Sequence, residues 1–403
     1  MLKGDLGTPL PNEGHISVRI IKMTLKKPAS KPSNPRFSSG PCTKPPTWTL
    51  KSLSGASLGR SHRSTIGKQK LQKAIDLTRK VLRIPNDFKI GIVPASDTGA
   101  FELAMWNLLG SRHVEMLAWE SFGAGWITDA ITQLKLEATI KKVDYGKIVD
   151  FNSVNFDNDV CFTWNGTTSG VKVSSKSNIP IKRKGLTLCD ATSAAFAMDL
   201  PWDRLDATTF SWQKVLGGEG GHGIIVLSPH AIERLLSYTP IWPLPKIFRL
   251  KKDNKLIEGI FSGETINTPS MLCVEDYLFA LDWAESIGGL PALIDRSNQN
   301  AKVLNDFVLN TPWLEFLAVE PDSRSNTSVC LLFNDHRIKN VKTFIKSVVK
   351  HLENEGVALD INAHKDAPPG LRIWCGATVE KSDLLSLVPW ITWAFQTAIS
   401  DQA

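Results

Sequence analysis

Two hydrophobic patterns alternate over most of the chain: apolar residues at helical spacing, and short continuous apolar runs. Apolar residues at near-helical spacing predict a helix over residues 65–82, which the Ile84-Pro85 pair ends. Further helices are predicted near residues 101–109 and 126–133. Short apolar runs between them predict strands over residues 88–94, 114–118, 138–143, 160–164, 186–189, 208–211 and 223–227. This alternation indicates an α/β fold with a mostly parallel sheet.

A second set of elements follows toward the carboxyl end. Helices are predicted over residues 274–287 and, after a Gly-Gly-Leu-Pro break, up to residue 309. The later elements are strands over residues 315–319, 328–333 and 371–375 and a helix over 341–355. This order is typical of a smaller α+β domain. We therefore predict an irregular extension over residues 1–33, a large domain over 34–290 and a small domain over 291–403.

The net charge of +7 is concentrated at the amino end. Residues 1–36 hold seven basic and two acidic side chains, which leaves the rest of the chain close to neutral. A nucleic-acid-binding face is therefore not predicted. Met23 offers a second start codon, so whether residues 1–22 belong to the native protein stays open.

Targeting segments and metal-site patterns are not predicted either. No apolar run reaches the roughly 18 residues of a transmembrane helix, and the first thirty or so residues lack the apolar stretch of a signal peptide. We predict a cytoplasmic protein without membrane partners. The six cysteines are scattered, without a Cys-x-x-Cys pair or an accompanying histidine cluster, so no metal site and no disulfide framework are predicted.

Lys214 is the most informative residue of the sequence. It follows the apolar run of residues 208–211 and precedes the glycine-rich segment 217–221. A lysine at the end of a buried strand is costly unless its charge is used or removed, and a Schiff base with an aldehyde cofactor is one such use. Glycines allow the backbone to turn and to approach a ligand closely. A surface lysine in a strand-to-loop turn explains these residues equally well.

Two other predicted strand ends carry polar residues. Ser96-Asp97-Thr98 stands between a strand and a helix, where exposed N–H groups favour a phosphate, although an ordinary helix cap is the simpler explanation. The Asp97 charge counts against a phosphate unless its carboxylate points away. Asp190 ends another apolar run and could pair with a pyridinium nitrogen or simply form a turn. Because ligands gather at the carboxyl ends of parallel strands, these residues and Lys214 together meet the requirements of pyridoxal phosphate.

Aromatic and hydroxyl side chains nearby add to this site. Phe122 or Trp126 could stack on a flat ring, although a core position is the simpler explanation for an aromatic residue here. Thr167 lies in a loop after a predicted strand and could bond a ring hydroxyl, or take part only in the turn.

At this point the residues resemble a known family. The chain is similar to the phosphoserine aminotransferases, which are fold-type I, class V aminotransferases, and most of all to their alphaproteobacterial and archaeal branch. The similarity runs from the segment Asn-Pro-Arg-Phe-Ser-Ser-Gly-Pro at residues 34–41 to the last helix. The resemblance implies a pyridoxal phosphate cofactor bound to Lys214. By the same resemblance, Gln213 and Ser96-Asp97-Thr98 contact its phosphate, Asp190 the ring nitrogen, Thr167 the ring hydroxyl, and Phe122 stacks on the ring.

The resemblance also implies a homodimer with shared active sites. The Asn267-Thr268 pair, which Pro269 follows, would reach the phosphate of the neighbouring subunit's cofactor. His62 and Arg63, in a Ser-His-Arg motif, would bind the substrate phosphate from across the dimer. The chain's other implied substrate residues are His364 and Lys365 for the phosphate and Arg372 for the α-carboxylate.

The implied reaction is reversible transamination between L-glutamate and 3-phosphohydroxypyruvate, which gives O-phospho-L-serine and 2-oxoglutarate. A phosphorylated intermediate of pyridoxine biosynthesis is an expected second substrate. The chain departs from the better-known branch in its Ala-Ser-Asp-Thr-Gly phosphate loop, where that branch has glycines and an arginine, and in lacking tryptophan at the expected stacking position. The alternatives are another enzyme of the same fold, such as a serine–glyoxylate-type aminotransferase or a cysteine desulfurase, and a non-catalytic protein that kept the fold.

Overall fold

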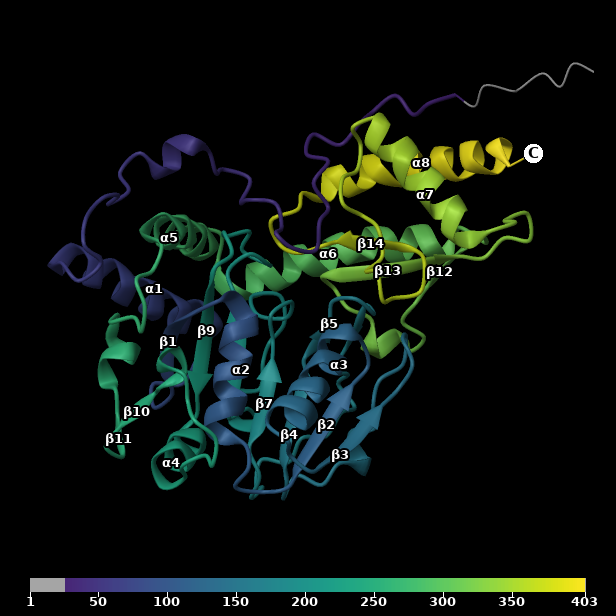
Figure 1. Cartoon of the computed structure of the whole chain (residues 1–403). Coiled ribbons are helices and arrows are strands. Elements are labelled where there is room, and N and C mark those ends of the chain that lie inside the picture. The colour runs from purple at the N-terminus through teal and green to yellow at the C-terminus, as the bar shows by residue number, and fades with distance from the viewer. Residues whose placement is uncertain (1–25, 403) are drawn as a thin grey trace, which may run out of the picture.

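The structure, a computed structural model, describes residues 26–402. The alternative start at Met23 lies outside the described residues. A seven-stranded sheet forms the lower part of the molecule in Figure 1, and a three-stranded sheet with two long helices lies above it. Within residues 26–402, no helix is long and apolar enough to cross a bilayer.

The strand order of the large sheet is β1-β9-β8-β7-β4-β2-β3. Neighbouring strands run parallel from β8 to β3, whereas β9 is antiparallel to both β1 and β8. The carboxyl ends of the other six strands therefore meet at one edge, together with the amino end of β9. The strands are β1 Lys89–Pro94, β2 Val114–Ala118, β3 Ala138–Lys142, β4 Asp159–Thr163, β7 Thr187–Asp190, β8 Ala207–Ser211 and β9 His222–Leu227.

Helices cover both faces of this sheet, which explains why its inner strands are apolar on both sides. In β9, Ile224 and Val226 belong to one buried cluster, while Ile225 and Leu227 belong to another. The first cluster includes α1 Thr65–Leu82 and α5 Met271–Ser286, and the second includes α2 Ser96–Leu108 and α4 Pro229–Ser237. α3 Ser121–Thr128 follows β2 and continues as a π-helical turn, Asp129–Gln133.

The smaller sheet consists of β12 Leu314–Phe316, β13 Ser328–Phe333 and β14 Leu371–Trp374, all antiparallel. It packs with α6 Gly289–Leu309, α7 Val341–Asn354 and α8 Lys381–Asp401. The other short strands are β5 Asn165–Gly166, β6 Val171–Lys172, β10 Lys251–Lys252 and β11 Lys255–Leu256. Short 3₁₀ turns cover Leu50–Leu53, Phe151–Ser153, Trp202–Arg204, Lys246–Phe248, Glu258–Ser262 and Pro321–Ser323.

Residues 26–33 are irregular and lie along the last two helices, as the purple segment in Figure 1 shows. Ser30 O accepts the indole N–H of Trp390 at 2.8 Å, and Ser33 N donates to Asp383 Oδ1 at 2.7 Å. The described part of the extension is therefore packed on the small sheet's helices. The boundaries between the extension, the large domain and the small domain stay predictions.

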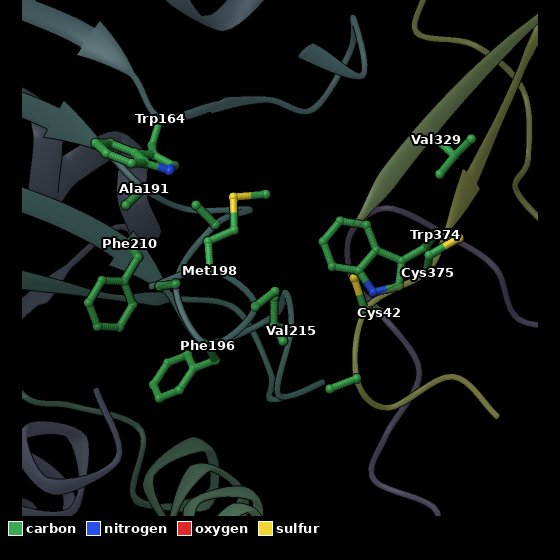
Figure 2. Close-up of a cluster of buried hydrophobic side chains, with 14 of the residues drawn as sticks. Cys42, Trp164, Ala191, Phe196, Met198, Phe210, Val215, Val329, Trp374 and Cys375 are labelled. Atoms are coloured by element: carbon green, nitrogen blue, oxygen red, sulfur yellow. The ribbon is translucent and has the colours of Figure 1, made fainter. Parts of the chain in front are cut away.

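A continuous apolar cluster joins the two sheets. Figure 2 shows Phe210 of β8 and Val215 on the large-sheet side, and Val329 of β13 with Trp374 of β14 on the other. Trp374 is fully buried, and Cys42 from the amino-terminal segment belongs to the same cluster. Because protein cores are densely packed, this joint fixes β14 against the carboxyl edge of the large sheet.

The structure corrects three predicted elements. The helix predicted near residues 126–133 begins at Ser121, and its last part, Asp129–Gln133, is a π-helical turn. The helix predicted from residue 101 begins at Ser96, because the polar residues read as a loop form its first turn. Ala95, the preceding residue, adopts a left-handed conformation with φ of 66°. The strand predicted over 315–319 ends at Phe316. The α/β fold with its mostly parallel central sheet is confirmed.

Candidate active site

The carboxyl edge of the large sheet contains a cavity. It is lined by the residues that the sequence indicated for the cofactor, namely Ser96, Asp97, Thr98, Phe122, Trp126, Thr167, Asp190, Gln213 and Lys214. They meet because β1, β4, β7 and β8 end at the same edge, and because β2 leads into α3 there. The cavity also includes residues that the sequence did not indicate, which are Glu120, Thr163, Asn165, Thr192 and Ser211.

Lys214 lies in the turn after β8 with its amine buried. Nζ donates a hydrogen bond to Ser39 O at 2.5 Å. Burial lowers the pKa of this amine, and the charge of Arg372 lowers it further, while Asp190 acts in the opposite direction. A Cβ at Gly40 would overlap Nζ, so the glycine gives the amine its space. Lys214 therefore has the depressed pKa that an amine nucleophile or base requires.

Asp190 ends β7 as a buried carboxylate with two hydrogen bonds. Trp126 Nε1 donates to Oδ2 at 3.2 Å, and Thr192 N donates to Oδ1 at 3.0 Å. Carboxylate oxygens each have a second acceptor position, so a protonated ring nitrogen can still bind.

Asp97 lies in the first turn of α2 and is also buried. Burial raises the pKa of its carboxyl group well above the usual range, and the negative charge of Asp190 raises it further. Burial thus favours the neutral, protonated form of Asp97. This weakens the objection that its charge would repel a phosphate at the start of α2, where the first amide N–H groups have no partner within the helix.

Several polar atoms of the cavity lack partners. Thr163 Oγ1, Ser211 Oγ and Gln213 Oε1 are buried without a hydrogen-bond partner within the described residues. Such groups are costly unless a ligand or water satisfies them. The amine of Lys214, the carboxylate of Asp190 and the start of α2 match the aldehyde, ring nitrogen and phosphate of pyridoxal phosphate, so the residues fit this cofactor.

Comparison with known proteins decides the family. No protein-family model matches the chain. A curated phosphoserine aminotransferase of Methanosarcina mazei is 56% identical over 370 residues, which cover 92% of this chain and 99% of that protein. Among solved structures, a phosphoserine aminotransferase from Cytophaga hutchinsonii matches with a TM-score of 0.76 at 20% identity, over 89% of this chain and 99% of that one. A phosphoserine aminotransferase from Trichomonas vaginalis with bound pyridoxal phosphate gives a TM-score of 0.71 at 18% identity, over 89% and 99% of the two chains.

The chain belongs to the phosphoserine aminotransferase family. The resemblance found in the sequence is thereby confirmed. The individual residue roles that it implies stay predictions, and the structure shows where each of these residues lies.

Two of the family's expected substrate residues lie near the cavity. Arg372, on β14, has its Nε buried without a hydrogen-bond partner within the described residues. Burial lowers the pKa values of both Lys214 and His364, and the positive charge of Arg372 lowers them further. His364 Nδ1 lies 3.5 Å from Ser121 Oγ, and its ring centroid is 5.9 Å from that of Phe122. Lys365, beside His364, is exposed. The small sheet thus brings basic groups toward the cofactor cavity.

The residues that the family resemblance assigns to a neighbouring subunit lie elsewhere. His62 and Arg63 line a second cavity with Lys68 and the segment 263–265. Asn267 and Thr268 follow that segment after one residue, Ile266, and none of these residues lines the Lys214 cavity. Within one chain, the His62-Arg63 pair and the Asn267-Thr268 pair therefore lie away from the Lys214 cavity.

The aromatic and hydroxyl candidates differ in their surroundings. The Phe122 side chain is 44% exposed, whereas Trp126 is buried and bound to Asp190. Phe122 is therefore the aromatic residue whose ring is more available for stacking. Thr167 Oγ1 donates to Ser193 Oγ at 2.8 Å and can still accept a hydrogen bond.

Glu120 is the most notable residue that the sequence reasoning missed. Its carboxylate accepts hydrogen bonds from Gly123 N and from Thr168 Oγ1, both at 2.7 Å. Burial raises its pKa to about 7, although these bonds act in the opposite direction. The signal was present, because Glu120 follows an apolar strand just as Asp190 does.

Proposed function

We propose that this protein is a pyridoxal phosphate-dependent aminotransferase that interconverts L-glutamate and 3-phosphohydroxypyruvate with 2-oxoglutarate and O-phospho-L-serine. The observation that carries the proposal is the convergence of Lys214, Asp190 and the start of α2 on one cavity. The named relative at 56% identity supports the choice of reaction. The phosphorylated intermediate of pyridoxine biosynthesis is proposed as a second substrate.

The cavity residues have complementary roles in holding the cofactor. When bound, pyridoxal phosphate supplies an aldehyde and an electron-accepting ring. Lys214 would bond the aldehyde, and Asp190 would keep the ring nitrogen protonated. The remaining contacts in this cavity are Ser96, Asp97, Thr98 and Gln213 toward the phosphate, Thr167 toward the ring hydroxyl and Phe122 over the ring.

Lys214 is also the proposed proton carrier. Once the amino donor has displaced Lys214 from the aldehyde, its lowered pKa favours the neutral amine, which could remove the α-proton of the amino acid and deliver a proton to the former aldehyde carbon. The joint between the two sheets keeps Arg372 near this amine. A guanidinium there would bind the α-carboxylate that amino acids and 2-oxo acids share, and would orient their reacting carbon.

We further propose a cytoplasmic homodimer whose subunits share residues between their active sites. His62 and Arg63 are basic but lie apart from the Lys214 cavity, next to the segment that leads to Asn267 and Thr268. A second subunit would bring them to a neighbouring active site, where His364 and Lys365 supply the other basic groups. The six free cysteines are compatible with a reducing compartment.

Reduction with borohydride in the presence of pyridoxal phosphate, followed by peptide mapping, tests the cofactor assignment. We expect the phosphopyridoxyl group on Lys214 and not on the exposed Lys365, which serves as an internal control. Absence of the group from Lys214 would remove the basis of the proposal.

Phosphate selectivity has a separate test. We expect Arg63→Ala to lower turnover of O-phospho-L-serine and to leave the slow turnover of L-serine unchanged. Arg60→Ala, an exposed arginine three residues earlier, is the matched control. Equal losses with both amino acids would contradict a phosphate contact, and equal wild-type activity on both would favour a serine–glyoxylate-type enzyme.

A further inference from the structure

A stack of aromatic rings lies directly behind the Lys214 turn. Trp212, two residues before Lys214, is fully buried. Its ring stacks on that of His222 with a centroid distance of 4.6 Å and on that of Tyr277 with a distance of 4.4 Å. The planes are inclined by 20° and 9°. The stack therefore connects the β8 turn, the start of β9 and helix α5.

His222 also holds the beginning of α5 through a hydrogen bond. Its Nε2 accepts the backbone N–H of Ser270, the N-cap of α5, at 3.1 Å. Burial lowers the pKa of His222 to about 4, so the ring is neutral at pH 7 and Nε2 is the acceptor. Ser270 lies three residues after Asn267 and two after Thr268. This bond thus fixes the backbone next to the Asn267-Thr268 pair.

The same stack also joins α5 to α1. Tyr277 Oη lies 2.8 Å from Thr78 Oγ1. Thr78 stands in the later part of α1, which begins at Thr65, so this bond holds the two helices together away from His62 and Arg63. The stack therefore anchors the start of α5 directly, through His222 and Ser270, and contacts α1 only near its end.

We propose that His222 is a positioning residue for the neighbouring subunit's active site. It fixes the Asn267-Thr268 segment of its own chain, which would reach that site, and it couples this segment to the Lys214 turn of the same chain. This inference rests on the proposed function, because it requires the shared active sites of a homodimer. The ligand affected is the phosphate group of the neighbouring cofactor, and the effect is on cofactor binding in trans.

Mixed dimers separate an effect in trans from a structural effect in cis. The reference dimer pairs a wild-type chain with a Lys214→Ala chain, so that only one reactive lysine is present. In the first arrangement, His222→Phe is added to the Lys214→Ala chain. In the second, it is placed in the chain that keeps Lys214. Phenylalanine preserves the ring but removes the acceptor for Ser270 N–H.

The dissociation constant of pyridoxal phosphate, followed by absorbance of the bound cofactor, is the readout. We expect it to rise roughly tenfold in the first arrangement, as for a lost hydrogen bond, and to stay at the reference value in the second. A rise in the second arrangement alone, an equal rise in both, or no rise in either would overturn the proposal. If the reference dimer itself binds no cofactor at Lys214, the proposed function fails instead.

A second pair of variants tests the same bond without altering His222. Ser270→Pro removes the N–H donor, whereas Ser270→Ala removes only the side-chain cap of α5. We expect the weaker cofactor binding with proline alone, again in trans. In the cofactor-free protein, His222→Phe should speed amide hydrogen exchange at the start of α5. Unchanged exchange would contradict the anchoring role.

Discussion

Asp97→Asn and Asp190→Asn make the same chemical change at neighbouring carboxyl groups, yet we expect a small loss of activity from the first and a large loss from the second. Burial and the charge of Asp190 raise the pKa of Asp97 well above its usual range, which favours its neutral form. An amide has nearly the same size and polarity. It carries one additional N–H donor, and leaving that donor without a partner costs about 1 kcal/mol, or about fivefold in an affinity.

Asp190 differs because its proposed partner is a cation. Trp126 and Thr192 already donate hydrogen bonds to it, and the ring nitrogen would add a charged one. Replacing one member of a buried ion pair typically costs about 3–5 kcal/mol, which corresponds to a factor between about 10² and about 4 × 10³. We therefore expect Asp190→Asn to lower kcat/KM by that factor, and Asp97→Asn by no more than about fivefold.

Unfolding by urea of the cofactor-free protein provides an independent assay. The folded protein keeps the Asp97 proton at pH values where the unfolded chain has lost it, so the free energy of unfolding falls as the pH rises above the usual aspartate range. Asp97→Asn should remove up to about 1.4 kcal/mol per pH unit of this slope. A variant with the wild-type slope, or with the kinetic loss of Asp190→Asn, would refute the reasoning.

Three further predictions follow from contacts around the cavity. Gly40→Ala places a Cβ on Lys214 Nζ, so we expect little phosphopyridoxyl group on Lys214 after borohydride reduction, whereas Gly55→Ala, with open space around its Cβ, should label normally. Burial raises the pKa of Glu120 to about 7, so the folded protein keeps its proton at pH values where the unfolded chain has lost it, and the wild type should lose up to about 3 kcal/mol of stability between pH 4.5 and 7. Urea unfolding of Glu120→Gln at several pH values should lack this loss. A variant with the wild-type pH dependence of stability would contradict a raised pKa. Arg372→Lys keeps the charge but not the paired N–H donors, so we expect kcat/KM for L-glutamate, measured by steady-state kinetics, to fall by about tenfold or more. A variant with wild-type kinetics would exclude the proposed carboxylate contact.

The sequence could indicate Lys214, Asp190 and Ser96 because each follows an apolar run, and parallel strands bring such residues to one edge. Glu120 follows the same rule after β2. The apolar run of β2 continues through Trp119, so Glu120 stands two residues beyond Ala118, the last residue of the strand. Apolar spacing also carries no information about strand direction, so the antiparallel course of β9 could not be predicted.

Contacts between distant segments were beyond the reach of sequence patterns. Ser39 accepts the hydrogen bond from Lys214 Nζ although 175 residues separate them. Arg372 came only from the family resemblance, because an arginine in a short strand carries no signal of a ligand. Its position depends on the packing of Trp374 and its neighbours between the two sheets, which only the structure shows.

The central claim is transfer of an amino group from a phosphorylated amino acid to a cofactor on Lys214, and a half-reaction tests it most directly. Protein loaded with pyridoxal phosphate is mixed with O-phospho-L-serine without any 2-oxo acid, and the absorbance spectrum and the 2-oxo product are measured. We predict conversion of the bound cofactor to its amino form with one equivalent of 3-phosphohydroxypyruvate, and much slower conversion with L-serine. An unchanged spectrum with O-phospho-L-serine, or equal rates with both amino acids, would contradict the account.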